Sequence, residues 1–320
     1  MIVVTGAAGF IGSALASHVL RRGHEVVIVD NFQNPGKSAN YQGKNFKHTI
    51  ERSEFMDWLQ LNATYVTKVF HLGARTDTAE MDTKIFDDLN LEYTKQIWNI
   101  CTKFQIPLLY ASSAATYGEG EYGYEDSHDI VENLKPLNPY GDSKNDFDKW
   151  ALEQQTCPPN WFGVKFFNVY GPNEYHKGRM ASVVYHCFHQ IKKNGEMKLF
   201  KSHKPNIADG QQSRDFIYIK DVIKMCDWLL ETLPTSGLYN IGTGKARSFY
   251  DLAASTFIAL GIKPNISFIE TPADIRDKYQ YYTQADMSKL KNAGYSDPCY
   301  TLEEGVADYA QNYLENEVIL

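Results

Sequence analysis

Tyr140 and Lys144 lie four positions apart in the stretch Asn-Pro-Tyr-Gly-Asp-Ser-Lys (138–144). On a helix this spacing places both side chains on one face, one turn apart. A free phenol has a pKa near ~10 and is a poor base at neutral pH, but a neighbouring ammonium favours the phenolate and makes proton exchange with an alcohol feasible. Because the same spacing recurs by chance in many helices, its meaning depends on the rest of the sequence.

A glycine-rich segment near the N-terminus supplies that context. The apolar residues 2–4 precede Thr-Gly-Ala-Ala-Gly-Phe-Ile-Gly (5–12), and a helical pattern follows. Strand, glycine turn and helix together bring backbone amides and a helix N-terminus onto a pyrophosphate. A second apolar strand, 26–29, ends in Asp30, where a carboxylate can bond an adenosine ribose. The alternative is a glycine turn without a ligand, but the order of these elements favours a nicotinamide dinucleotide and redox chemistry.

The type of dinucleotide is less clear from the residues alone. Asp30 favours NAD, because a carboxylate repels the 2′-phosphate of NADP. Lys37 and Arg52 follow the second strand and could pair with that phosphate, although each could equally be a solvated surface charge.

Composition narrows the class of protein. A chain of 320 residues predicts two domains or one large α/β unit, and the net charge of −7 argues against a nucleic-acid partner. The five cysteines are scattered, so they predict reduced thiols rather than a disulfide framework, and no ligand cluster predicts a metal site. No apolar run approaches the ~20 residues that a membrane span needs. Because the first strand begins at Ile2, we expect no signal peptide and a cytoplasmic protein.

Strand-like and helix-like segments alternate through the first half of the chain. Further strands are expected at 66–72, 107–112 and 162–167, and helices at 89–104 and from Tyr140 to about 155. This order predicts an α/β fold with a Rossmann-type doubly wound parallel sheet, whose functional residues lie at the carboxyl ends of the strands.

The second half of the chain does not continue the regular alternation of strands and helices. A helix is expected at 180–193, an irregular stretch at 194–212, and strands that return to the sheet at 216–219 and 237–241. We therefore expect a smaller, discontinuous α/β substrate-binding domain. The dinucleotide domain would comprise 1–167, about 214–242 and a segment near 280–290, and the substrate domain 168–213, 243–279 and 291–320.

Several motifs resemble those of the extended short-chain dehydrogenases that act on nucleotide sugars. They are the glycine loop 5–12, Tyr-Ala-Ser-Ser-Ala-Ala-Thr-Tyr-Gly (110–118), the Tyr140–Lys144 pair and Phe-Phe-Asn-Val-Tyr-Gly-Pro (166–172). Narrower motifs resemble the ADP-heptose 6-epimerase family. They are His-Lys-Gly-Arg-Met-Ala-Ser (176–182), Arg-Asp-Phe (214–216), Tyr-Asn-Ile-Gly-Thr-Gly (239–244) and Tyr-Gln-Tyr-Tyr-Thr-Gln-Ala-Asp (279–286).

The resemblance implies an isomerase that oxidises and re-reduces carbon 6 of an ADP-heptose, or of another nucleotide sugar, for lipopolysaccharide core precursors. It implies NADP in preference to NAD, and a homo-oligomer. The epimeric hydroxyls point in opposite directions, so the family uses two acid/base residues. The matching catalytic residues are Tyr140, Lys177, Lys144 and Ser113.

The resemblance also implies the binding residues. Those expected around the cofactor are Gly6, Gly9, Phe10, Ile11, Gly12, Asp30, Asn31, Lys37, Arg52, Leu72, Gly73, Ala74, Arg75, Thr76, Asn90, Tyr140, Lys144, Val169 and Lys177. Those expected around the substrate are Ser113, Asn168, Arg179, His186, Phe200, Arg214 and Tyr279.

Two departures from the family pattern bear on the substrate. Arg179 stands where the family usually has a small serine, and the loop 202–213 is longer than usual. A UDP-hexose 4-epimerase is the main alternative, but it needs only the tyrosine and would leave Lys177 without a role. A dehydratase is disfavoured because Ala114 and Ala115 replace its usual Asp-Glu pair. A cofactor-binding sensor without activity is a third possibility, although such proteins typically lose the tyrosine or the lysine.

Overall fold

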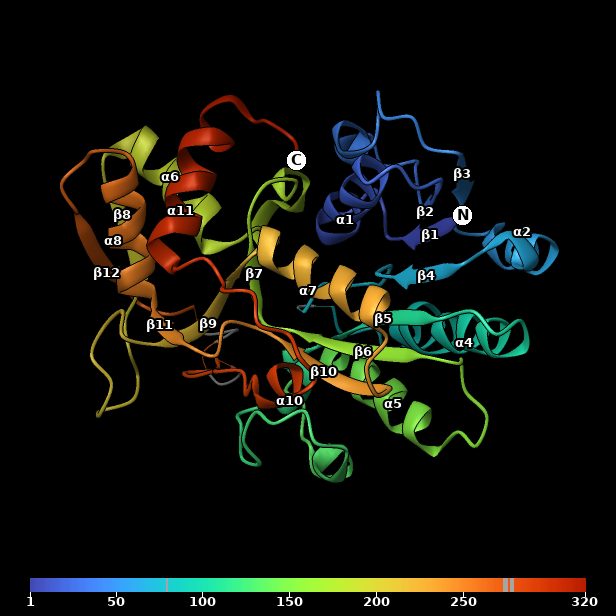
Figure 1. The fold of residues 1–320 in the computed structure, drawn as a ribbon. Coiled ribbons are helices and arrows are strands. Elements are labelled where there is room, and N and C mark those ends of the chain that lie inside the picture. Colours follow the sequence, from blue (N-terminus) through green and yellow to red (C-terminus); the bar gives the residue numbers. More distant parts are fainter. Residues whose placement is uncertain (79, 273–275, 277–278) are drawn as a thin grey trace.

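A seven-stranded parallel sheet forms the larger part of the molecule (Figure 1). The computed structural model describes residues 1–78, 80–272, 276 and 279–320. All neighbouring strands of this sheet run parallel. In spatial order they are β10 (Gly237–Ile241), β6 (Trp161–Phe166), β5 (Leu108–Ser113), β4 (Lys68–His71), β1 (Ile2–Thr5), β2 (Val26–Asp30) and β3 (His48–Glu51). The order reverses at β1, and ligands of open α/β sheets bind at such a switch point.

Helices cover both faces of this sheet. The covering helices are α1 (Phe10–Arg21), α2 (Phe55–Asn62), α4 (Tyr93–Lys103), α5 (Pro139–Glu153) and α7 (Ile219–Thr232). Alternation along β1 separates the two layers, because Ile2 and Val4 pack into the cluster with α1 and α7, whereas Val3 packs into the cluster with α2, α4 and α5. Strands buried on both faces read as continuous apolar runs, which explains the sequence of β1 and β2.

Two small sheets lie at the other end of the molecule (Figure 1). One contains β7 (Asn168–Tyr170), β9 (Ser213–Tyr218) and β11 (Ala246–Ser248), and the other contains β8 (Met197–Phe200) and β12 (Ile266–Ile269). The helices around them are α6 (Val183–Asn194), α8 (Phe249–Ala259) and α11 (Leu302–Asn312), while α10 (Ser288–Asn292) lies beside β10. None of the helices that the described residues form has the length and apolar character needed to span a bilayer.

The α/β fold with a parallel Rossmann-type sheet is confirmed, but two strand expectations need correction. The segment expected to return to the main sheet at 216–219 is a strand, β9, but it pairs with β7 and β11 instead. Apolar alternation predicts a strand but does not identify its partner. The segment 194–212 contains β8, where irregular structure was expected. The outer strand β3 was missed because His-Thr-Ile-Glu carries little apolar pattern on an exposed edge.

A cluster of aromatic rings holds α4 and α5 against the middle of the sheet. Trp98 is completely buried, and its ring centroid lies 5.1 Å from that of Trp161, 5.9 Å from Trp150, 6.0 Å from Phe147 and 6.3 Å from Tyr110. These rings come from two helices and two strands, so they fix α5, the helix that carries Tyr140, relative to β5 and β6.

Trp98→Ala should therefore lower the free energy of unfolding by about 3–5 kcal/mol, through lost burial and the cavity left behind. Leu61→Ala is the control, because Leu61 is 82% exposed and its truncation should change stability by no more than about 0.5 kcal/mol. Urea unfolding measures both variants. Similar small effects for the two would show that the aromatic cluster does not hold the layers together.

Candidate active site

The N-terminus of α5 places Tyr140 at the edge of the sheet. The Asn138 side chain caps the helix by accepting a hydrogen bond from the Gly141 amide at 2.9 Å, and Pro139 occupies the first turn, where its missing N–H costs nothing. Tyr140 and Lys144 both line a cavity of about 920 Å³. The sequence prediction that they share a helix face toward a site is therefore consistent with the structure.

Lys144 connects this helix to β5. Its side chain is 95% buried, and Nζ donates a hydrogen bond to the carbonyl oxygen of Ala111 at 2.7 Å. Burial lowers the pKa of Lys144 to about 8, and the carboxylate of Asp148 opposes this by favouring the ammonium. Ser113, at the end of β5, lines the same cavity and accepts the Ala115 amide at 3.1 Å.

The pKa of the Tyr140 phenol is raised, rather than lowered as the sequence predicts. Burial is the largest effect and raises the pKa of its phenol, while a hydrogen bond with Ser113 lowers it. Lys144 is not among the causes of this shift, so the expected lowering by its ammonium is not seen in this state. Burial favours the neutral phenol, whose hydroxyl lies beside Ser113.

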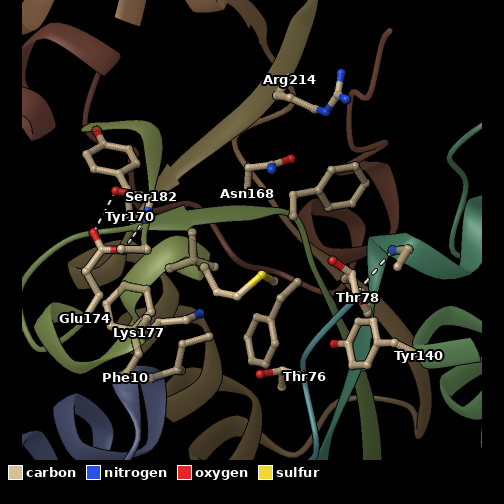
Figure 2. Close-up of a pocket in the computed structure, with 18 of the residues that line it drawn as sticks. Phe10, Thr76, Thr78, Tyr140, Asn168, Tyr170, Glu174, Lys177, Ser182 and Arg214 are labelled. Carbon is tan, nitrogen blue, oxygen red and sulfur yellow. Dashed lines mark hydrogen bonds between the residues drawn. The ribbon is translucent and has the colours of Figure 1, made fainter. Parts of the chain in front are cut away.

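Lys177 lies on the other side of the cavity. Figure 2 shows its side chain and that of Tyr140 on facing sides of the pocket. The short helix Tyr175–Met180 carries it, and its Nζ lies 5.5 Å from the centroid of the Phe10 ring. Burial lowers the pKa of Lys177, and the carboxylate of Glu174 partly opposes this shift. A lysine that loses its proton more easily than usual can act as a base as well as an acid.

Glu174 is a lining residue that the sequence analysis did not single out. It is 99% buried and accepts hydrogen bonds from the Ser182 hydroxyl at 2.7 Å, the Ser182 amide at 2.5 Å and the Gly171 amide at 3.3 Å. Burial raises the pKa of this carboxyl, and those hydrogen bonds oppose the shift. The available signal was its place three residues before Lys177, which is one helical turn.

The far end of the cavity combines a cation with aromatic rings. Arg214 is 94% buried, and its guanidinium carbon lies 5.5 Å from the centroid of the Tyr279 ring and 5.7 Å from that of Phe249. Asn168 also lines this end (Figure 2). A planar guanidinium between rings can bind a phosphate with two hydrogen bonds, whereas the rings provide faces for stacking.

A second cavity of about 590 Å³ adjoins the first, and the two share Phe10, Leu72 and Lys177 among their lining residues. The glycines at 6, 9 and 12 line it together with the ends of β1, β2 and β4. A Cβ built on Gly12 would lie 2.2 Å from the carbonyl oxygen of Gly6, so the tight turn that exposes the backbone amides depends on glycine. Backbone, shape and charge thus fit a dinucleotide with its pyrophosphate at the start of α1.

Asp30 and Lys37 form an ion pair at the ribose end of this cavity. Lys37 Nζ lies 3.1 Å from Asp30 Oδ1, while Asp30 Oδ2 accepts the Ala8 amide at 2.9 Å. Arg52 lines the same region. Lys37 offsets the charge of Asp30, and this reduces the carboxylate's repulsion of a phosphate.

Most of the predicted site residues line these two cavities. Those in the dinucleotide cavity are Gly6, Gly9, Phe10, Ile11, Gly12, Asp30, Asn31, Lys37, Arg52, Leu72, Gly73, Ala74, Arg75, Thr76 and Lys177. Those in the larger cavity are Tyr140, Lys144, Ser113, Asn168, Val169, Arg214 and Tyr279, together with Phe10, Ile11, Leu72, Ala74, Thr76 and Lys177. No three or more His, Cys, Asp or Glu side chains form a group that could hold a metal ion in the part of the chain that the structure describes.

Four predicted residues are not among the lining residues of either cavity. Arg179 is exposed and its guanidinium lies 3.3 Å from a carboxylate oxygen of Asp77. His186 faces the carbonyl of Arg179 at 3.4 Å, and the Phe200 ring packs edge-on to Tyr279 with centroids 6.3 Å apart. Asn90 is buried, and its amide bonds the backbone of Arg75 and the hydroxyl of Ser143.

A family model places this architecture in a known class. The model of the NAD dependent epimerase/dehydratase family matches residues 2–242. The chain belongs to this family, whose cofactors are nicotinamide dinucleotides and whose members include enzymes for nucleotide sugars.

Comparison with full-length relatives indicates which members of the family the chain resembles. The chain is 46% identical to the ADP-L-glycero-D-manno-heptose-6-epimerase of Fusobacterium nucleatum, with 99% of each chain covered. It is 42% identical to the protein of the same name from Nitratidesulfovibrio vulgaris, with 98% of each covered. Its structure is similar to that of the Helicobacter pylori ADP-L-glycero-D-manno-heptose-6-epimerase, with a TM-score of 0.82, 28% identity, and coverage of 98% of this chain and 96% of that one. These full-length likenesses confirm the family resemblance that the sequence motifs indicated.

The close backbone approach at Gly12 gives a testable consequence. Gly12→Ala should weaken dinucleotide binding at least about tenfold, because the Cβ forces the Gly6 turn away from the pyrophosphate; tenfold corresponds to about 1.4 kcal/mol. Gly23→Ala is the matched control at the other end of α1, where φ is +84° and the Cβ meets nothing within 4 Å. It should cost stability without changing affinity. Isothermal titration calorimetry with NAD and NADP measures the affinity of both variants and of the unmodified protein. If Gly12→Ala binds as tightly as the unmodified protein, this loop does not bind the pyrophosphate.

Proposed function

We propose that this chain interconverts the two carbon-6 epimers of ADP-glycero-manno-heptose, a step toward lipopolysaccharide core precursors. The observation that carries the proposal is the pair of proton-transfer groups, Tyr140 and Lys177, that line one cavity from facing sides (Figure 2). The full-length relatives with that name support the choice of substrate. A single acid/base cannot readily serve two hydroxyls that point in opposite directions, whereas two facing groups can.

The residues divide the work as follows. The glycine turn 6–12 and the ends of β1, β2 and β4 would hold the dinucleotide, which would supply reversible hydride transfer at carbon 6. Tyr140 and Lys177 each exchange a proton with the oxygen of one epimer, and Ser113 holds the reacting oxygen beside the phenol. Lys144 anchors α5 through Ala111 and provides positive charge below the phenol. The ketone intermediate must rotate within the site so that its other face meets the hydride donor. The cavity of about 920 Å³ is large enough for this rotation.

The other parts of the substrate have separate places in this proposal. Arg214, with Tyr279 and Phe249 beside it, would bind the diphosphate and adenosine. We propose that the part of the chain around the small sheets binds the substrate, and that the seven-stranded sheet binds the cofactor. The preferred cofactor is NADP, supported by Lys37 and Arg52 in the ribose end of the cavity.

The main alternative is a 4-epimerase that uses a single base. A UDP-glucose 4-epimerase from Thermus thermophilus has the same fold, with a TM-score of 0.79 at 24% identity, and at that identity the likeness concerns the fold alone. The position of Lys177 in the wall shared by both cavities favours the two-base reaction, because a 4-epimerase would give this partly buried lysine no chemical task.

Removing either base should stop the overall reaction. Tyr140→Phe and Lys177→Met should each reduce epimerisation on the order of 10²–10⁴-fold, as expected for a positioned acid/base, while dinucleotide and substrate still bind. Tyr65→Phe and Lys193→Met are matched controls, because both residues are exposed. Chromatographic separation of the ADP-heptose epimers measures turnover.

Each single variant retains one base, so it should still carry out one half-reaction on a carbonyl analogue. If Lys177→Met interconverts the epimers at the rate of the unmodified enzyme, Lys177 is only a loop lysine, and the single-base 4-epimerase becomes the better assignment.

The cofactor preference is tested by a pair of charge changes. Lys37→Ala should weaken NADP binding about 10- to 100-fold, because a hydrogen bond to a charged group contributes about 1.5–3 kcal/mol, and should affect NAD much less. Asp30→Asn should shift the ratio in the opposite direction, since it removes the repulsive carboxylate. Equal losses for both dinucleotides in Lys37→Ala, measured by titration, would contradict the NADP assignment.

A further inference from the structure

A buried ion pair lies directly beneath the proposed catalytic residues. Tyr140, Lys144 and Asp148 follow one another at intervals of four residues, so they lie on one face of α5. Asp148 on α5 and Lys165 on β6 are both buried, at 0% and 1% exposure. Oδ2 of Asp148 lies 2.6 Å from Nζ of Lys165. The mechanism proposed above uses neither residue.

The carboxylate of Asp148 joins α5 to β5 through two hydroxyl groups. Tyr110 donates to Oδ1 at 3.0 Å, and Ser112 donates to Oδ2 at 2.7 Å. Between these two residues, Ala111 accepts the hydrogen bond from Lys144. Three successive residues of β5 are thus bonded by two side chains of α5.

Lys165 extends the network to the catalytic serine. Its Nζ donates to the hydroxyl of Thr116 at 2.8 Å, and that hydroxyl donates to the carbonyl oxygen of Ser113 at 2.8 Å. The ammonium also lies 5.1 Å from the centroid of the Tyr117 ring, on the same turn. An unbroken chain of hydrogen bonds therefore runs from α5 through β6 to the residue that holds the reacting oxygen.

We propose that Asp148 and Lys165 are positioning residues, which fix Ser113 relative to Tyr140 and Lys144 in the reaction proposed above. A buried ion pair contributes little net stability, and an apolar pair of similar volume often replaces it without loss. Removing only one partner is strongly destabilising, because it leaves an unpaired buried charge. A structural role and a positioning role can therefore be separated by replacing both partners at once.

The central test is the double variant Asp148→Leu with Lys165→Met. It should remain folded and bind dinucleotide, but kcat should fall at least tenfold with KM changed less than threefold, because Ser113 and the phenol are no longer held in register. Lys165→Arg keeps the charge and should retain most of the activity. The control is Asp308→Leu with Lys220→Met, which removes a partly exposed pair at 2.5 Å that also has a tyrosine hydroxyl donor, Tyr218. That control should leave kcat unchanged.

The pH profile provides a readout that a purely structural role would not move. Lys144 interacts with the charge of Asp148 on α5 and with His71 on β4, whose pKa burial lowers to about 3. Tyr110 on β5 and Lys165 on β6 contact Asp148 in turn, and Tyr140 lies one turn before Lys144 on α5. Asp148 favours the Lys144 ammonium, so the double variant Asp148→Leu with Lys165→Met, which leaves no unpaired buried charge, should move the alkaline limb of kcat/KM to lower pH. The control pair Asp308→Leu with Lys220→Met should not move it.

A crystal structure of the double variant tests the proposal without any substrate, and so separately from the proposed function. Displacement of Ser113 from the Tyr140 phenol supports the positioning role. Unchanged positions of Ser113 and Tyr140, or an unchanged kcat, would overturn it. If the unmodified enzyme fails to epimerise ADP-heptose, the proposed function fails, while the crystallographic result still decides the role of the pair.

Discussion

The attachment of α5 to β5 is the constraint on which the site depends. Lys144 donates to the carbonyl of Ala111, and Asp148 accepts hydroxyl hydrogen bonds from both neighbours of that residue. The aromatic cluster around Trp98 packs against the same helix and strand. Because these contacts fix the helix along and across the strand, Tyr140 is presented to the cavity from a rigid element rather than from a loop. Preorganised groups of this kind need little rearrangement during reaction.

A second buried network joins the dinucleotide cavity to the same helix. Thr94 donates its hydroxyl proton to the carbonyl of Asn90 at 2.6 Å, so it must accept from Nε2 of His71 at 3.0 Å. Nδ1 of His71 is then the acceptor for Thr5, at the end of β1. Asn90 lies in a π-helical turn, Asp87–Glu92, and bonds both Arg75 and Ser143. Neutral His71 and Asn90 thus link the walls of the cofactor cavity to α5.

The sequence predicts local structure and residue chemistry well, but it does not predict which distant segments come into contact. The apolar runs of β1 and β2 and the glycine turn follow from short-range rules, and they formed as expected. The polar edge strand β3 carried no such pattern, and the partner of β9 depends on contacts distant in the chain. For the same reason Asp148 and Lys165, which the fold brings together in a fully buried pair, were not singled out from the sequence. Arg179, expected beside the substrate, extends to Asp77 instead of lining the cavity.

The central claim of the proposed function is that one carbon is oxidised and then re-reduced while the sugar stays bound. ADP-heptose carrying deuterium at carbon 6 tests this most directly, with mass spectrometry and NMR of the product epimer formed in ordinary water. The account predicts that the deuterium stays at carbon 6 of the same molecule while the configuration inverts, because hydride leaves and returns without exchange with solvent. Loss of the label to solvent at carbon 6, or inversion at another carbon, would contradict it.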